Sequence, residues 1–224
     1  MTSREQIAHR LDQATQSARI LEHPFYEAWR QGNLTRDDLA FYAGQYWRQV
    51  EAFPGYLGAL ADRLPDEAAA VVCANLADEV EGDHQGMWLA FAQAVGADGD
   101  AVRATSPEPE TRACVESFSI AAASASPAFA LGMIYGYESQ TPEVATTKAD
   151  GLRDHYGIEG PGVEYFEVHG EIDVEHSAEL AGALATIATS DAELGEAAAG
   201  ARAGAEAIWR LLDGVARERQ LVDA

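Results

Sequence analysis

The chain has 224 residues, of which 47% are hydrophobic, and this is enough for one domain with a substantial core. Lys and Arg total 15 against 37 Asp and Glu, and the formal charge of -22 repels nucleic-acid phosphates and anionic lipid headgroups. We therefore expect no nucleic-acid partner and no role at a membrane.

Apolar residues recur with the 3.6-residue period of an amphipathic helix along most of the chain, and Pro and Gly stand mainly between these stretches. No segment reads convincingly as a strand. We predict an all-α helical bundle formed by a single domain over residues 1–224. The predicted helices cover residues 3–20, 24–31, 36–63, 66–95, 109–124, 127–155, 161–187 and 190–218.

The first residues are polar and amphipathic, which is unlike a signal peptide, and no segment approaches the ~18 apolar residues of a membrane span. Cys73 and Cys114 show no metal-type or redox-type spacing. These features favour a cytoplasmic protein.

Pro142 falls inside the predicted helix 127–155, where its ring would clash with the carbonyl group four residues earlier. We expect a kink about one turn beyond Glu138, where a bent helix could open room for a ligand.

His169, Asp173 and His176 stand at i, i+4 and i+7, so they share one face of the predicted helix 161–187. Glu81 and His84 form a Glu-x-x-His pair on an earlier helix, an arrangement that bundle di-metal proteins use to aim two ligands at one point.

Glu138 is a carboxylate in an apolar and aromatic stretch, where a bare charge would be costly. Three carboxylates and three imidazoles without a thiolate suit iron or manganese. Zinc would bind such ligands but would carry out no redox chemistry.

Each of these motifs also has an ordinary structural explanation. A lone Glu-x-x-His on an acidic helix is usually a surface coincidence, and the His–Asp–His stripe could be a solvated face. Glu138 could be a buried carboxylate bonded to tyrosine hydroxyls. We favour a metal site because suitable groups occur on three separate helices of a predicted bundle.

The metal motifs and several other stretches together resemble the heme-oxygenase-like di-iron oxidases, and within them the CADD-type para-aminobenzoate synthases. The similarity spans nearly the whole chain. Its strongest stretches are Leu21 to Trp29, Phe53 to Leu57, Asn75 to Glu79, Tyr137 to Pro142 with Lys148 following, and Tyr165 to His176.

The resemblance implies a heme-oxygenase-like fold, two iron ions or an iron–manganese pair, dioxygen as co-substrate and an external reductant. The ligands it implies are His84, Glu138, His169, Asp173 and His176. The sequence leaves the oligomeric state open, a homodimer included.

The remaining glutamate ligand is ambiguous, because CADD-type proteins place it further ahead of the histidine and that position is Ala77 here. Glu81 and Glu79 are the two candidates. On a regular helix Glu81 would share a face with His84 whereas Glu79 would point nearly the opposite way, so we expect Glu81 to be the ligand.

CADD-type enzymes are thought to consume one of their own tyrosines and to take nitrogen from an internal lysine. The matching residues are Tyr26, Tyr42 and Tyr137, with Lys148 as the lysine. Lys148 is the only lysine in the chain. Its ordinary explanation is a surface position, because lysines are seldom buried.

Other aromatic residues serve a core as well as a cofactor pocket. Trp88 lies one turn beyond His84, so we expect it to form a wall of the cofactor pocket. We interpret Tyr46 and Tyr56 as packing residues.

The function that we favour is an oxygen-activating di-iron oxidase that uses its own side chains. One alternative keeps the metals but acts on an external amino acid or fatty acid. Metal-free thiamin-degrading or quinone-cofactor relatives would not need six ligands, and a non-enzymatic interaction protein has no reason to bury carboxylates beside imidazoles.

Overall fold

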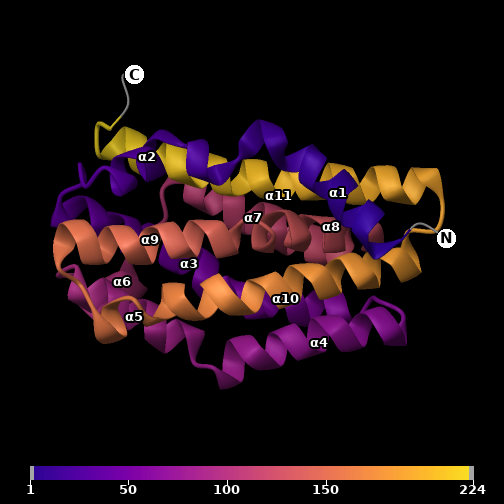
Figure 1. Cartoon of the computed structure of the whole chain (residues 1–224). Coiled ribbons are helices and arrows are strands. Elements are labelled where there is room, and N and C mark those ends of the chain that lie inside the picture. Colours follow the sequence, from indigo (N-terminus) through magenta and orange to yellow (C-terminus); the bar gives the residue numbers. More distant parts are fainter. Residues whose placement is uncertain (1–2, 222–224) are drawn as a thin grey trace.

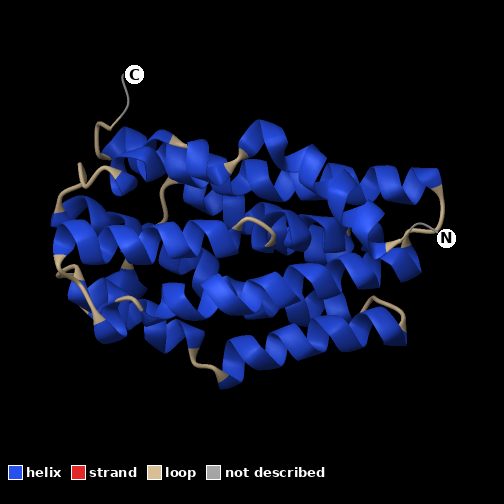
Figure 2. Ribbon diagram, viewed as in Figure 1, coloured by secondary structure: helices blue, strands red, loops and turns tan. Residues whose placement is uncertain are grey.

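The computed structural model describes residues 3–221, and every regular element among them is helical (Figure 2). The predicted all-α bundle is therefore confirmed. The α-helices are α1 (Arg4–Thr15), α2 (Pro24–Arg30), α3 (Arg36–Ala61), α4 (Asp66–Glu81), α5 (His84–Ala94), α6 (Gly99–Ala104), α7 (Pro109–Ser124), α8 (Pro127–Glu138), α9 (Thr141–Tyr156), α10 (Glu164–Ile187) and α11 (Asp191–Glu218). Short 3₁₀ turns are η1 (Gln16–Ala18), η2 (Ile20–Glu22) and η3 (Gly160–Gly162).

The helices surround one continuous hydrophobic cluster. In Figure 1, α10 runs between α9 and α4, and it contacts both of them. Helix α3 packs against α4, α5 and α7, while α11 lies along α8. Consequently α10, which carries the His–Asp–His stripe, contacts the helices that carry Glu81, His84, Glu138 and Lys148.

Helices α8 and α11 approach backbone to backbone through glycines. A Cβ atom on Gly136 would overlap the carbonyl oxygen of Ala201, and one on Gly200 would overlap the carbonyl oxygen of Phe129. The missing side chains let the two helices meet closely, which seats the end of α8, with Tyr137 and Glu138, inside the bundle.

The predicted helix 66–95 is interrupted. Helix α4 ends at Glu81, and α5 begins at His84 after a break at Gly82 and Asp83. Asp83 adopts a left-handed conformation with φ of 51°, and its carboxylate accepts a hydrogen bond from the Gly86 backbone amide, capping α5. Because of this break, the side chains of α5 do not continue the angular spacing of the side chains of α4.

The predicted helix 127–155 is likewise two helices. Helix α8 ends at Glu138, and Pro142 occupies the first turn of α9 instead of kinking one long helix. Proline is tolerated there because the first turn of a helix needs no amide hydrogen-bond donor. The expected irregularity beyond Glu138 is thus a break at Ser139 and Gln140.

Two further differences lie away from the site. The predicted helix 3–20 stops at Thr15, and the six-residue helix α6, capped by Asp98, was not predicted. Within residues 3–221, no helix has both the length and the apolar character needed to cross a membrane.

Candidate functional site

The three residues of the His–Asp–His stripe share the inward face of α10. His169, Asp173 and His176 are 3%, 2% and 4% exposed, which removes the explanation of a solvated face. Buried imidazoles and carboxylates at this spacing need polar partners, and helix α4 supplies Glu79 to His169 and Asp78 to His176.

A first cluster joins His169 to Glu79 and His84. The Glu79 Oε2 atom lies 3.1 Å from His84 Nδ1, and Glu79 Oε1 lies 3.5 Å from His169 Nε2. One candidate ligand atom from each residue falls within 4.8 Å of the others. Burial would raise the pKa of Glu79, but the two imidazoles lower it to about 2, so the carboxylate is ionised.

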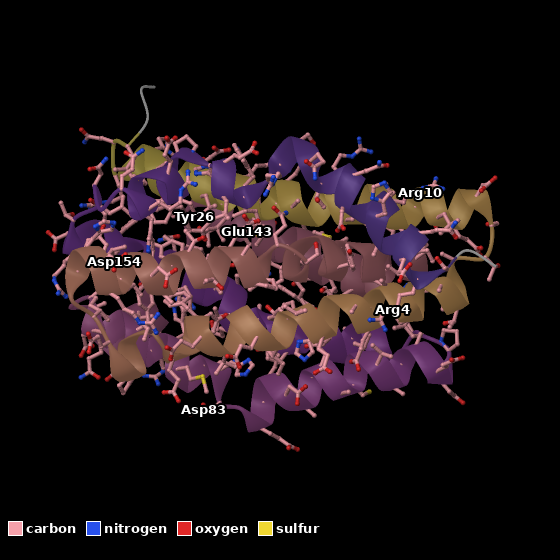
Figure 3. The ribbon with its side chains drawn as sticks, viewed as in Figure 1. Arg4, Arg10, Tyr26, Asp83, Glu143 and Asp154 are labelled. Atoms are coloured by element: carbon pink, nitrogen blue, oxygen red, sulfur yellow. The ribbon has the colours of Figure 1, made fainter. Side chains whose placement is uncertain are left out.

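The glutamate in this cluster is Glu79, and the prediction that Glu81 would face His84 is wrong. Glu81 is exposed, whereas Glu79 is 8% exposed. The prediction assumed one regular helix through both residues. The break at Gly82 and Asp83, which Figure 3 shows at the junction of α4 and α5, turns His84 back toward Glu79.

A second cluster contains Glu138, Asp173 and His176. The Asn75 side chain donates a hydrogen bond of 2.8 Å to Glu138 Oε1, while Glu138 Oε2 is buried without a hydrogen-bond partner. His176 Nδ1 lies 3.3 Å from Asp173 Oδ1, and its Nε2 atom bonds Asp78 at 3.1 Å.

The charges of the second cluster are unbalanced. Burial, followed by the nearby charge of Asp173, raises the pKa of Glu138 well above 4.5. Burial alone would lower the pKa of His176, but Asp173, Glu138 and Asp78 raise it to about 9. An added cation would let all the carboxylates ionise together.

The donor set suits metal ions by its chemistry and by its unpaired atoms. His84 Nδ1, His176 Nδ1 and Glu138 Oε2 are buried, and none of them makes a hydrogen bond of acceptable geometry. The backbone carbonyl of Tyr165 accepts a hydrogen bond of 2.7 Å from His169 Nδ1, which leaves Nε2 as the ligand atom. Carboxylates and imidazoles without thiolates suit iron or manganese.

Lys148 is buried, at 4% exposed, and shares a cavity with Tyr165, whose ring stacks on His169. Its Nζ atom donates a hydrogen bond of 2.7 Å to the Tyr42 hydroxyl, which lies 3.1 Å from the Tyr26 hydroxyl. Nζ also lies 4.8 Å from the centre of the Tyr26 ring. Burial lowers the pKa of Lys148 well below 10.5 and favours the neutral amine. Figure 3 shows Tyr26 on the side of α2 that faces α9.

Tyr137 lies between the group formed by Lys148, Tyr26 and Tyr42 and the candidate metal ligands. Its hydroxyl accepts a hydrogen bond of 3.3 Å from Tyr46, and the Tyr46 ring stacks on Trp88 with 5.1 Å between ring centres. Trp88 is fully buried, and its indole nitrogen donates to the Ala43 carbonyl group, while its role as a wall of the cofactor pocket stays a prediction. The centres of the Trp88 and Tyr165 rings are 4.9 Å apart.

Two tyrosines near the site were missed as site candidates. Tyr46, which we interpreted as a packing residue, contributes its hydroxyl to this chain of tyrosines. Tyr165 stacks on the His169 ring, with 4.0 Å between centres and 26° between planes. The spacing of Tyr165 four residues before His169 was the available signal.

A small cavity lies beside Lys148. Its volume is about 20 Å³, and its lining includes Lys148, Tyr26, Tyr46, Tyr137 and Tyr165. A volume of this size holds roughly one water-sized molecule.

Comparisons with a family model and with known proteins point to the same family. The family model described as "iron-containing redox enzyme" matches residues 40–209. A 4-aminobenzoate synthase of Nitrosomonas europaea is 34% identical over 218 residues, covering 92% of this chain and 89% of that protein. A 4-aminobenzoate synthase of Chlamydia muridarum is 35% identical over 187 residues, covering 82% and 79% of the two chains.

Solved structures support the same fold. A TenA homologue from Pseudomonas syringae superimposes with a TM-score of 0.82 at 18% identity, covering 95% of this chain and 92% of that one. Together with the family match and the curated relatives, these findings show that the chain belongs to the iron-containing redox enzyme family, whose fold is heme-oxygenase-like.

Proposed function

We propose that this protein is a di-iron oxidase that makes para-aminobenzoate from its own side chains. Tyr26 or Tyr42 supplies the ring, and Lys148 supplies the nitrogen. The observation that carries the proposal is the buried Lys148 amine, 2.7 Å from the Tyr42 hydroxyl and beside a cavity of about 20 Å³. The similarity to 4-aminobenzoate synthases supports the same product.

Six residues would hold the metals. Glu79, His84 and His169 supply one group of ligands, and Glu138, Asp173 and His176 supply the other. Two bound irons, or an iron and a manganese, would supply the electrons that reduce dioxygen, and an external reductant would restore them.

The chain's own residues prepare the reacting groups. Aromatic rings surround Lys148, and burial lowers the pKa of its amine, which favours the unprotonated form that a nucleophile requires. Because Lys148 Nζ donates its hydrogen bond to Tyr42, the amine is held 4.8 Å from the Tyr26 ring centre. Burial also raises the pKa values of the Tyr26 and Tyr42 hydroxyls, so both phenols stay protonated until they are oxidised.

The size of the cavity argues against the external amino acid or fatty acid. Binding pockets for small organic ligands have volumes of about 300 Å³ or more. The cavity next to Lys148 is far smaller, and the protein's own amine and phenols line it.

The test uses iron-loaded, reduced protein exposed to dioxygen with no added substrate. We expect a small aromatic amine in the filtrate and a matching mass loss confined to Lys148 and to Tyr26 or Tyr42. Lys148→Met is the matched control, because it keeps the length of the side chain and the apolar packing but has no nitrogen. Full oxygen consumption with an unchanged chain mass would contradict the proposal and favour an external substrate.

A further inference from the structure

The small cavity beside Lys148 is separated from a larger surface groove by a thin wall. The groove lies between α9 and α10 and has a volume of about 380 Å³. Phe166 lines both the groove and the small cavity. The two hollows therefore share this one residue as part of their walls.

The wall is about one aromatic ring thick. Lys148 Nζ lies 5.2 Å from the centre of the Phe166 ring on the inner side. On the outer side the ring meets the groove, although only 1% of Phe166 is exposed. Next to it, Ala149 closes the groove with a single methyl group. A rotation of the Phe166 side chain, which packs against the rings of Trp29, Trp88 and Phe91, would therefore connect the groove to the cavity.

The molecule that would use this passage must be small and neutral. The cavity holds roughly one water-sized molecule. The groove carries Asp150, Glu167 and Glu171 against one arginine, Arg153, which is ion-paired with both Asp150 and Glu167. This excess of negative charge disfavours anions such as carboxylate metabolites. Dioxygen is neutral, apolar and small enough.

We propose that Phe166 is the gate through which dioxygen passes from the groove between α9 and α10 to the cavity beside Lys148. The inference rests on the proposed use of dioxygen. It assigns the groove a role as the access route and Phe166 a role as its moving wall.

The experiment measures how fast dioxygen quenches buried tryptophans in the full chain without added iron. The chain has four tryptophans. Trp29 and Trp88 are fully buried, and their ring centres lie 6.2 and 5.9 Å from that of Phe166. Replacing Trp47 and Trp209 with Phe leaves these two as the only reporters.

The matched pair of variants is Phe166→Leu and Phe91→Leu. Phe91 is equally buried and contacts both reporter tryptophans, with ring centres 6.1 and 5.2 Å away, but it lines neither hollow. Both variants therefore remove the same atoms from the same core. We expect Phe166→Leu to raise the rate constant of dioxygen quenching on the order of twofold, because passage no longer waits for a ring rotation. Phe91→Leu should leave it unchanged.

Acrylamide, which is much larger than dioxygen, reports any general loosening of the core. Its quenching should stay low in both variants. Equal dioxygen quenching in the two variants, or a parallel rise with acrylamide in Phe166→Leu, would overturn the proposal. If Phe166→Leu does not fold, Val168→Phe supplies the test, because it adds a ring within the groove and must slow quenching. No turnover is involved, so failure here is distinguishable from failure of the oxidase proposal.

Discussion

Two buried polar regions lie against each other in this protein, and they differ in whether their polar atoms find hydrogen-bond partners within the chain. The metal-type clusters contain buried atoms that make no hydrogen bond, among them Glu138 Oε2 and His176 Nδ1. In the lysine–tyrosine region, the Lys148 amine and the hydroxyls of Tyr26 and Tyr42 all find partners within the chain. The first region leaves buried polar atoms unpaired, whereas the three polar groups of the second pair with one another.

This difference matches the roles that we propose for the two regions. Carboxylates and imidazoles that converge and leave some of their buried atoms unpaired are suited to a cation, which offsets the cost of burying the carboxylates. An amine and phenols that form hydrogen bonds with one another leave no polar group free to bind an external substrate. In the proposed reaction these groups are the reactants.

The largest expected effect comes from removing ligands of the first region. The double variant His169→Ala, His176→Ala takes one imidazole from each cluster. We expect this variant to bind fewer than the roughly two ions per chain that are typical of a carboxylate site in a helical bundle. Metal analysis after anaerobic iron loading measures this. Stoichiometric metal binding by the folded double variant would contradict the assignment of the first region as a metal site.

Glu79 and Glu81 provide a sharper test of the same region. Glu79→Ala should lose metal because it opens the cluster with His84 and His169, while Glu81→Ala should bind as the wild type does, because its side chain is exposed. Metal titration of the two variants side by side distinguishes them. The reverse result would mean that the chain around Gly82 and Asp83 rearranges when metal binds.

Asp78 should have a smaller effect, because it acts through His176. Its carboxylate accepts a hydrogen bond from His176 Nε2 and so fixes the ring with Nδ1 toward Asp173. Removing such an orienting partner typically weakens metal binding by about 10- to 100-fold. We expect this loss for Asp78→Ala in competition titrations with a chelator, with Glu81→Ala, another acidic residue of α4, as the control. An affinity equal to that of the control would assign Asp78 no orienting role.

The second region is tested through the pH dependence of stability. The pKa of Lys148 is lowered in the folded state, so between that value and about 10.4 the unfolded chain binds the extra proton. Folding stability due to this residue therefore increases with pH and is lost as pH falls, with a slope of up to about 1.4 kcal/mol per unit. Denaturant unfolding should show Lys148→Met as the more stable protein at pH 7, with the difference shrinking toward pH 10. A difference that does not change with pH would mean that Lys148 is charged in the folded state.

Much of this arrangement could be predicted from the sequence, because spacing along a single helix determines which side chains share a face. His169, Asp173 and His176 lie on the unbroken helix α10, and their common inward face was predicted correctly. The placement of Glu81 failed because it extended the same rule across a helix break. A left-handed Asp83 depends on packing and capping that the helical period does not describe.

Contacts between residues on different helices were harder to predict from the sequence. The family resemblance pointed to Lys148 and Tyr42, but the hydrogen bond between them joins residues on α9 and α3, which no spacing rule relates. The stacking of Tyr165 on His169 followed from i, i+4 spacing and could have been foreseen. The role of Tyr46 required knowing that α3 and α8 place its hydroxyl against Tyr137.

The most direct test of the central claim uses the fact that Lys148 is the only lysine in the chain. Protein produced with lysine labelled with ¹⁵N at its side-chain nitrogen carries that label at one position. After anaerobic iron loading, reduction and exposure to dioxygen, mass spectrometry of the released aromatic amine reads the origin of its nitrogen. The account predicts para-aminobenzoate carrying ¹⁵N. An unlabelled product would contradict it, because the amine would then have come from another source.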